Sequence, residues 1–439
     1  MNKKNIWRIL GYNIDKSMIH LNSLKTLSKQ AFWDRQKRDR DLILYHHINN
    51  NSWYRNFIRD ECGLEWNSIP IVSKSDLQDF AINNSPPRQF FLNKIYFANT
   101  SGSSGHPLSF WKDKECHSLA WAKIYNSYQN LGININDKEA RFFGHVKDSS
   151  KNYILELLKD IVFNRIRFDV FNISDINFKS FFDIFKKNKV HYIYGYTNII
   201  LEFSKFLLKN NLSPLLDVSN HLKLCIVTAE MCFEADRLII EKALGVPVFK
   251  EYGSSETSII AIQNNQFNWD VSTDRLWVEV LDDNNNPVSD GIEGKIVVTD
   301  LYNKDFPFIR YDVGDIGSIE NVDTFPYLHL NSLIGRQSDM IYLPSGKQAP
   351  GLTFYYISRS ILFKKQIIKE FRIIQKQLNL FKFLIVAEKE LGSSEKNEII
   401  IAASKYLEPD LIFEFEMVDK IDNCYSTKIQ HFFSELKRV

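Results

Sequence analysis

VHYIYGYTNIILEFSKFLLKNNLSPLLDVSNHLKLCIVTAEMCFEADRLIIEKALGVPVFKEYGSSE, residues 190–256, decides the fold class of this 439-residue chain. It contains three short apolar runs, at 190–196, 222–230 and 247–253, with two longer segments between them. Those segments, at 199–211 and 233–245, repeat apolar residues at the three- and four-residue spacing of an amphipathic helix. A helix between two strands allows a crossover, so the pattern predicts parallel strands with helices on the faces of their sheet. We therefore expect the α/β class.

The same alternation extends back to about residue 90. Strand-like runs at 94–100 and 139–146 alternate with helical segments at 114–132, 152–163 and 178–189. Before them, residues 1–60 are predicted to form helices with irregular joints, and Ser73 or Ser75 is placed to cap a short helix over 75–82. Across 90–260 we expect a largely parallel sheet.

The pattern changes near residue 268. Polar and apolar residues alternate there around the turn-rich segments DDNNNP (282–287) and DGIEG (290–294). This indicates antiparallel strands, as a hairpin or a small barrel-like part packed beside the main sheet. The polar stretch 335–351 is typical of a linker, and a small α+β unit follows it. We expect a large domain over 1–334, a hinge over 335–341 and a small, mobile C-terminal domain over 342–439.

Composition limits the partners of the chain. Lys and Arg number 55 and Asp and Glu 53, so the formal charge is +2 and no basic footprint for nucleic acid is present. No stretch approaches the ~18 uninterrupted apolar residues of a membrane-spanning helix. Arg8 interrupts the first apolar run before a signal peptide can form. The five cysteines are widely spaced, so we expect them to be reduced and the protein to be cytoplasmic.

The loop TSGSSGHP (100–107) concentrates small and hydroxyl-bearing residues after a strand. In that context successive N–H groups form a concave nest that suits anions, phosphates above all. The loop lacks the Lys-Ser/Thr of a Walker loop, and the chain has no G-x-G-x-x-G. Taken alone, the loop is either a connector or a phosphate site.

Four later segments carry side chains suited to nucleotide chemistry. Glu256 follows a strand end in EYGSSET (251–257), and Asp315 lies near a turn in PFIRYDVGDIG (307–317). Arg336 lies in IGRQSDMIY (334–342), and Lys428 lies in CYSTKIQHF (424–432). Mg²⁺ prefers one or two carboxylates together with phosphate oxygens, which Glu256 and a nucleotide would supply.

With these motifs in this order, the chain resembles the adenylate-forming superfamily of acyl-CoA synthetases and their relatives. It is most similar to the phenylacetate–coenzyme A ligase-like branch, which includes AMP-ligase proteins found with capsule-polysaccharide genes. The resemblance covers nearly the whole chain and rests on TSGSSGHP, YGSSE, FIRYDVGDIG, GRQSDMI and STK. It implies a cytoplasmic ligase that uses ATP and Mg²⁺, with coenzyme A as co-substrate. A carboxylate attacks the α-phosphate of ATP to give an acyl adenylate and pyrophosphate, and a thiol then displaces AMP.

The resemblance also implies residue roles. Lys428 would bridge the attacking carboxylate and the α-phosphate, Glu256 would hold Mg²⁺, and Asp315 would accept the ribose hydroxyls. The implied catalytic residues are Lys428, Glu256 and Thr100. The implied ATP-binding residues are Thr100, Ser101, Gly102, Ser103, Ser104, Gly105, Ala229, Glu230, Glu251, Tyr252, Gly253, Ser254, Ser255, Asp315 and Arg336. The implied acid pocket is lined by Phe143, His145, Tyr194 and Tyr196, and the implied hinge is Ser338 and Asp339.

The chain departs from the family pattern at several places. The hinge has Ser338-Asp339 in place of Asp-Asp, and Thr427 replaces the glycine of the Ser-Gly-Lys loop. No cysteines for a structural zinc follow YGSSE, so we expect no zinc. Leu108 follows the loop proline where many acyl-CoA synthetases have a lysine, so positive charge is expected from Mg²⁺ and Lys428.

The sequence leaves several alternatives open. The acyl acceptor is either coenzyme A or an amine, as in surface-polysaccharide or natural-product assembly, and a third possibility is an inactive relative that binds nucleotide. Glu256 as a helix-start carboxylate, Tyr252 as a core aromatic and Lys428 as a solvated lysine are the structural alternatives. The expected partners are a small carboxylic acid and an acyl acceptor, without nucleic acid or integral membrane, for a monomer or homodimer.

Overall fold

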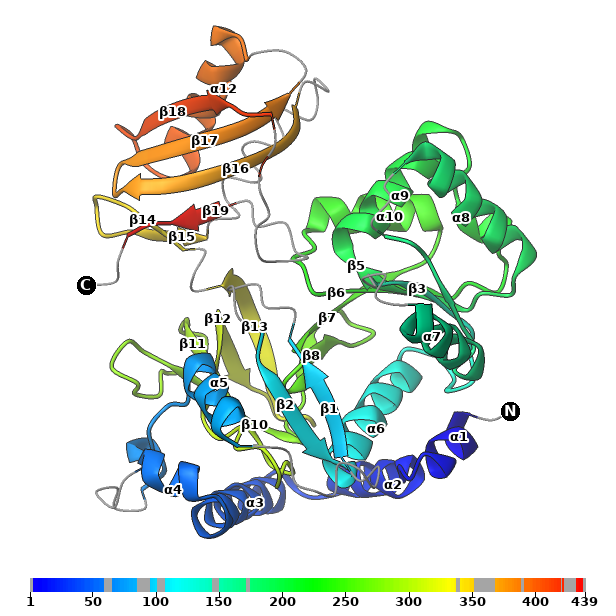
Figure 1. Ribbon diagram of the computed structural model, residues 1–439, viewed down its shortest axis with the longest axis vertical. Helices are drawn as coiled ribbons and strands as arrows, with labels where there is room; N and C mark the ends of the chain where they lie inside the picture. The colour runs from blue at the N-terminus through cyan, green and yellow to red at the C-terminus, as the bar shows by residue number, and fades with distance from the viewer. Residues whose placement is uncertain are drawn as a thin grey trace.

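The structure is a computed structural model that describes residues 3–58, 65–84, 95–100, 107–143, 150–170, 174–336, 340–350, 368–387, 391–419, 421 and 432–436. In that part of the chain, eleven strands join in one sheet in the order β10-β11-β12-β13-β9-β8-β7-β6-β5-β3-β4 (Figure 1). They are β3 (Glu139–Phe142), β4 (Arg165–Arg167), β5 (Tyr192–Tyr196), β6 (Leu224–Thr228), β7 (Val248–Ser254), β8 (Ser258–Gln263), β9 (Trp269–Val271), β10 (Leu276–Leu281), β11 (Gly294–Asp300), β12 (Tyr311–Asn321) and β13 (Leu328–Arg336). Strands β4, β3, β5, β6 and β7 run parallel. The predicted α/β class is confirmed.

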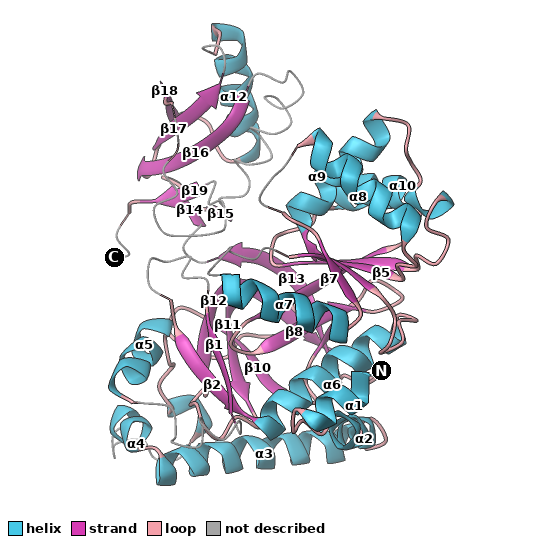
Figure 2. Ribbon diagram, turned by 45° about the vertical axis from the view of Figure 1, so that its right-hand side comes forward, coloured by secondary structure: helices cyan, strands magenta, loops and turns pink. Residues whose placement is uncertain are grey.

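Helices cover both faces of the parallel part of the sheet. Helices α8 (Asp175–Lys187), α9 (Thr197–Lys209) and α10 (Glu234–Leu244) lie on one face, and α6 (Lys114–Asn130) lies on the other (Figure 2). Helix α9 shows why the helices pack on the sheet: Ile199, Phe203 and Phe206 recur on one side of the helix and are buried against the strands. The further helices that precede β5 are α1 (Lys3–Ile9), α2 (Ile14–Leu24), α3 (Lys29–Asn50), α4 (Ser52–Ile58) and α7 (Ser150–Val162), and of these α3 and α4 contribute Leu44 and Tyr54 to the core of the antiparallel half.

The sequence predicts that the antiparallel strands pack beside the main sheet. In the structure they instead continue that sheet edge to edge. After β7 the chain turns back at 254–258, and β8 pairs antiparallel with β7, so hydrogen bonding passes on to β9, β13, β12, β11 and β10. A separate hairpin of β1 (Ile95–Asn99) and β2 (Ser109–Asp113) packs against this half, where Phe110 and Ile296 share one core. The whole sheet is therefore mixed: the strands between 139 and 254 run parallel, as predicted for that part of the chain, and the later strands are antiparallel.

Helix α5 (Lys74–Asn83) packs against the same half and begins one residue before the predicted span. The Ser73 hydroxyl accepts from Asp76 N at 3.2 Å, and the Asp76 carboxylate accepts from Ser73 N at 2.8 Å. This reciprocal capping box satisfies two backbone donors that a helix start otherwise leaves unpaired. Of the two predicted caps, Ser73 is the one that the structure uses.

The C-terminal unit has a smaller sheet, in the order β18-β17-β16-β19. Its elements are β16 (Ile368–Gln377), β17 (Leu380–Ala387), α12 (Ser393–Tyr406), β18 (Ile412–Met417) and β19 (Phe432–Ser434). The stretch expected to be a linker contains a hairpin of β14 (Met340–Tyr342) and β15 (Gln348–Pro350). Ile341 and Leu343 are buried in the core of the C-terminal unit, and this apolar pair explains why a polar stretch is ordered there. None of the described helices combines the length and apolar character needed to cross a bilayer.

Candidate active site

Tyr252, Asp315 and Arg336 meet where the parallel half of the sheet joins the antiparallel half. The Tyr252 hydroxyl donates to Asp315 Oδ2 at 2.8 Å, and Arg336 Nε lies 3.1 Å from Asp315 Oδ1. Asp315 and Arg336 are directly opposite each other in the β12–β13 ladder. Burial raises the pKa of Tyr252 well above its usual value, so this phenol remains a neutral donor. Thus three residues that the sequence predicts for the nucleoside come together in space.

Glu256 lies in the tight turn between β7 and β8 and is only 8% exposed. Its Oε1 accepts from the Tyr311 hydroxyl at 3.2 Å. The turn is fixed from within, because Thr257 N donates to Ser254 Oγ at 3.0 Å. At Gly253 any Cβ would collide with the carbonyl oxygen of Ser258, so the YGSSE glycine is required by the close approach of two strands. Glu256 is therefore a held, buried carboxylate, whereas Ser255 at the tip is exposed.

Thr100 closes the base of the Ser/Gly loop. Its N–H donates to the Leu108 carbonyl and its Oγ1 accepts from Leu108 N, both at 2.9 Å. Residues Ser101, Gly102, Ser103, Ser104 and Gly105 lie outside the described part of the chain. The described contacts show that the two ends of the loop are clamped together.

Lys74 is a charged residue near the site that no motif in the sequence indicates. It lies in the first turn of α5 and interacts electrostatically with Glu256 and Arg336. Burial lowers the pKa of its ammonium, Glu256 raises it and Arg336 lowers it further. The sequence marked this segment only as a helix start, and nothing in the local pattern places it next to a turn 180 residues away. Lys74 brings a further positive charge to the side of Glu256.

An aromatic wall forms at the carboxyl ends of β3 and β5. Phe143 stacks on Tyr196 with ring centroids 4.3 Å apart and on Tyr194 at 5.8 Å. The Tyr194 hydroxyl donates to Glu251 Oε1 at 3.1 Å, and Tyr128 of α6 donates to Glu251 Oε2 at 2.8 Å. Burial raises the pKa of Glu251. Of the predicted acid pocket the structure brings Phe143, Tyr194 and Tyr196 together.

Glu251 and Tyr252 were both predicted to bind ATP, but their side chains face opposite ways. Successive residues of a strand point to opposite faces of the sheet. The Tyr252 side chain therefore reaches Asp315, while the Glu251 side chain joins the tyrosines of the aromatic wall. The side chain of Glu251 thus lies with the aromatic wall and not with Asp315.

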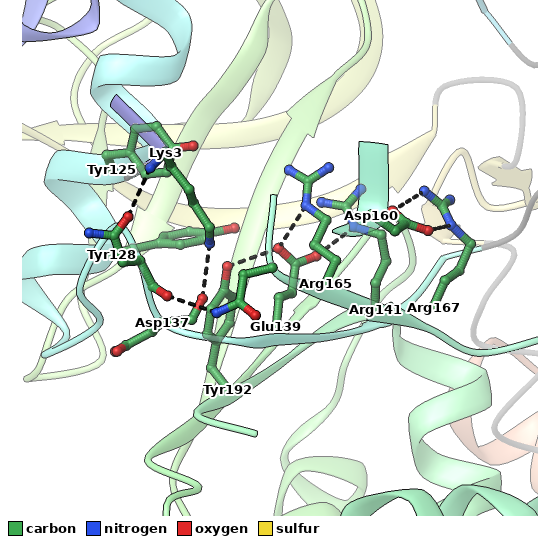
Figure 3. A network of polar contacts seen from close by, with 12 residues as sticks. Lys3, Tyr125, Tyr128, Asp137, Glu139, Arg141, Asp160, Arg165, Arg167 and Tyr192 are labelled. Carbon is green, nitrogen blue, oxygen red and sulfur yellow. Dashed lines mark hydrogen bonds and ion pairs between the residues drawn. The ribbon is translucent and has the colours of Figure 1, made fainter. Parts of the chain in front are cut away.

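A buried polar network supports the aromatic wall from the amino-terminal side of β3 (Figure 3). Glu139 pairs with Arg141, lies 3.4 Å from Arg165 Nε and accepts from the Tyr192 hydroxyl at 2.8 Å. Burial by itself would raise the pKa of Glu139, but the two arginines and the tyrosine lower it to about 2. The Arg141 guanidinium also lies 5.1 Å from the centre of the Tyr194 ring, which links the network to the wall.

Ala229 and Glu230 occupy the turn after β6. Ala229 has a left-handed backbone (φ +67°). The Glu230 carboxylate accepts from Asn198 N at 2.8 Å, and its carbonyl accepts from the Thr197 hydroxyl at 3.1 Å. A carboxylate at a helix start satisfies unpaired N–H groups and suits the positive end of the helix dipole. In this structure Glu230 therefore fixes the start of α9 beside the aromatic wall.

Several predicted residues fall outside the described part of the chain. These are His145 of the acid pocket, Ser338 and Asp339 of the hinge, and Lys428. Among the residues that are described, no three His, Cys, Asp or Glu side chains gather in a group able to hold a metal ion.

Comparison with known proteins places this geometry in a wider context. No family model matches the chain. Protein CapK of Staphylococcus aureus is 22% identical over 451 residues, which cover 97% of this chain and 92% of CapK. Among solved structures, 2-hydroxyisobutyryl-CoA ligase in the postadenylation state, in complex with R3-HIB-AMP, is 17% identical with a TM-score of 0.70. That match covers 94% of this chain and 91% of the ligase.

A second solved structure is O-succinylbenzoate coenzyme A synthetase from Bacillus subtilis in complex with AMP. It is 16% identical, has a TM-score of 0.54 and matches 76% of this chain and 67% of the synthetase. At these identities the likeness concerns the fold, and it extends over both the large sheet and the smaller C-terminal unit of the first structure. The chain has the fold of the adenylate-forming superfamily, the family that its five motifs resemble.

Proposed function

We propose that the chain is an ATP-dependent ligase that activates a carboxylic acid as an acyl adenylate and transfers the acyl group to coenzyme A. The observation that carries the proposal is the convergence of Tyr252, Asp315 and Arg336 beside the Glu256 turn. A ribose presents two hydroxyls, and Asp315 is a carboxylate held in place by a neutral phenol and a cation. The neighbouring structures in complex with R3-HIB-AMP and with AMP support the same class of ligand.

In the first half-reaction a carboxylate oxygen of the acid attacks the α-phosphorus of ATP. The bond from that phosphorus to the bridging oxygen breaks, and pyrophosphate leaves. In the second half-reaction the coenzyme A sulfur attacks the acyl carbon, the bond from that carbon to the AMP oxygen breaks, and the thiol proton goes to solvent. The chain contributes positioning and charge, because such reactions leave the protein little covalent chemistry to do.

Glu256 is the residue that would hold Mg²⁺. A single buried carboxylate fits this ion, because Mg²⁺ takes one or two carboxylates and completes its shell with phosphate oxygens and water. When bound, the ion would neutralise charge on the phosphates. Lys74 interacts electrostatically with Glu256, so α5 would add positive charge near a site whose loop has Leu108 where many acyl-CoA synthetases have a lysine.

The second candidate acceptor is an amine, in the assembly of a surface polysaccharide or a natural product. The similarity to CapK spans nearly the whole chain. The name of that protein does not specify coenzyme A as an acceptor, so this match is compatible with an amine as well. Both acceptors share the adenylation step and differ only in the nucleophile of the second step.

ATP–pyrophosphate exchange with a panel of carboxylic acids tests the adenylation step. Exchange that depends on one class of acid is expected, and exchange with none of the acids would leave only nucleotide binding. Adding coenzyme A or amines to the active acid then identifies the acceptor by the product formed.

Lys428 is proposed as the lysine that bridges the carboxylate and the α-phosphate. Lys428→Ala is expected to lower exchange by about 10²–10³-fold, the usual effect of removing one preorganised charge donor. Lys347→Ala, which removes an exposed lysine of the same C-terminal unit, serves as the matched control. Retention of exchange in Lys428→Ala would show that another group carries this role.

A further inference from the structure

A buried arginine lies directly behind the turn that carries Glu256. Arg275 precedes β10 and is fully buried, as is Asp300 at the end of β11. Arg275 Nη1 donates to Asp300 Oδ2 at 2.8 Å. Its Nη2 donates to the carbonyl oxygen of Thr257, the residue after Glu256. One guanidinium therefore links the turn between β7 and β8 to Asp300 at the end of β11.

Asp300 is itself held by further groups besides Arg275. It accepts from the backbone N–H of Tyr302 at 3.2 Å, and the Cys116 thiol lies 3.5 Å from Oδ2. Lys112, which is buried in β2 just after the Ser/Gly loop, interacts electrostatically with Asp300 and Glu256. Through Lys112, Asp300 and Arg275, β2 therefore interacts with the turn that carries Glu256.

Buried charges of this kind are expensive for stability and need a reason to persist. An ion pair inside a protein adds little net stability compared with apolar residues of the same volume. The Arg275 fork has a geometric use, because its two Nη groups donate to a carboxylate and to a carbonyl in fixed planar directions, which the flexible ammonium of a lysine does not provide. The residue that this fork immobilises is a neighbour of the proposed metal ligand.

We infer that Arg275 is a positioning residue that fixes Glu256 for binding the Mg²⁺–nucleotide complex. The inference rests on the proposed function, since it assigns Arg275 a part in the same site. Arg275 acts through the Thr257 carbonyl and not through contact with substrate. Loss of the two Arg275 hydrogen bonds should let the turn that carries Glu256 relax. It should weaken binding of the metal–nucleotide complex more than it slows the adenylation step.

The test uses Arg275→Lys and Arg275→Met in the full chain. Arg275→Lys keeps the positive charge beside Asp300 but loses the planar fork, and in Arg275→Met Asp300 still interacts electrostatically with Lys112. The matched control is Arg167→Met with Asp160→Leu, which removes another ion pair, at 2.8 Å, that lies in β4 and α7 and makes no described contact with the 254–257 turn. The two readouts are equilibrium binding of Mg²⁺ with a non-hydrolysable ATP analogue and the Mg²⁺ dependence of ATP–pyrophosphate exchange.

Both Arg275 variants are expected to bind the Mg²⁺–analogue complex roughly 10–100-fold more weakly, the usual range for a residue behind a metal ligand. They should regain much of their exchange rate at high Mg²⁺, and the control pair should bind as the wild type does. Wild-type affinity in a folded Arg275→Lys, or an equal loss in the control pair, would overturn the inference. If the wild type itself neither bound the complex nor catalysed exchange, the proposed function would be at fault instead.

Discussion

At the scale of single residues, the site is built from side chains held by partners from other parts of the sequence. Tyr252 orients Asp315, Tyr311 contacts Glu256, and Arg275 holds the carbonyl beside Glu256. Each partner comes from a different segment of the chain. The site therefore depends on contacts between segments that are far apart in the sequence, and no single motif contains both partners of such a contact.

Asp315→Ala should weaken binding of ATP and AMP. The change removes a carboxylate that accepts from Tyr252 and pairs with Arg336, and a hydrogen bond to a charged group contributes roughly 1.5–3 kcal/mol. The expected loss is about 10–100-fold in nucleotide affinity, measured by equilibrium titration. Asp290→Ala, in an exposed loop where Asp290 accepts from Asn321, is the control. Unchanged affinity in Asp315→Ala would remove this residue from the ribose site.

At the scale of elements, α5 shows how a capped helix start brings charge to a distant turn. The Ser73–Asp76 capping box fixes where the helix begins, and Lys74 is the next residue along. Val72, just before the cap, bridges to β12 at Tyr311, the residue that donates to Glu256. The start of α5 is thus attached to the wall of the site through its backbone.

Ser73→Ala should destabilise the protein by about 1 kcal/mol, the typical effect of losing an N-cap side chain. The measurement is urea unfolding at neutral pH. Ser75→Ala is the control, because Ser75 is exposed and does not cap the helix, and only a few tenths of a kcal/mol are expected there. Equal effects of the two changes would contradict the assignment of Ser73 as the cap.

At the scale of the whole molecule, the core holds titratable groups far from the site. His47 is 1% exposed, and its Nε2 lies 2.9 Å from the carbonyl oxygen of Asn303. Burial lowers the pKa of His47 to about 4. The unfolded chain therefore binds a proton more readily than the folded one below about pH 6.5. Stability that His47 gives at higher pH is lost as the pH falls from about 6.5 to about 4.

His47→Gln should flatten the decline of unfolding free energy between about pH 6.5 and 4. The shift in pKa corresponds to roughly 3 kcal/mol by the lower end of that window. Urea unfolding across this pH range measures it, with His46→Gln as a control at the neighbouring, less buried position. Glu139 titrates lower, because its pKa is about 2, so its contribution is lost only as the pH falls from about 4.5 toward 2. A variant with the same slope as the wild type would show that His47 is not the group responsible.

Part of this architecture is predictable because it is local. The helix-then-strand repeats in 190–256, the cap at Ser73 and the strand–helix–strand order of the C-terminal unit follow from periodicity and turn chemistry. The hairpin at 340–350 was missed, because Ile341 and Leu343 are only two apolar residues in a polar stretch. Their partners lie in strands that begin after residue 367, and a local window contains neither.

The sequence by itself determined the α/β class and the order of the motifs, because both depend on spacing along the chain. Only the tertiary structure decided that the antiparallel strands continue the parallel sheet, since strand pairing is a contact between distant segments. It also separated Glu251 from Tyr252 and brought Lys74 and Arg275 to the Glu256 turn. Those contacts join segments with no common pattern. The physical reason is that burial and pairing are properties of the packed molecule, whereas periodicity is a property of the chain.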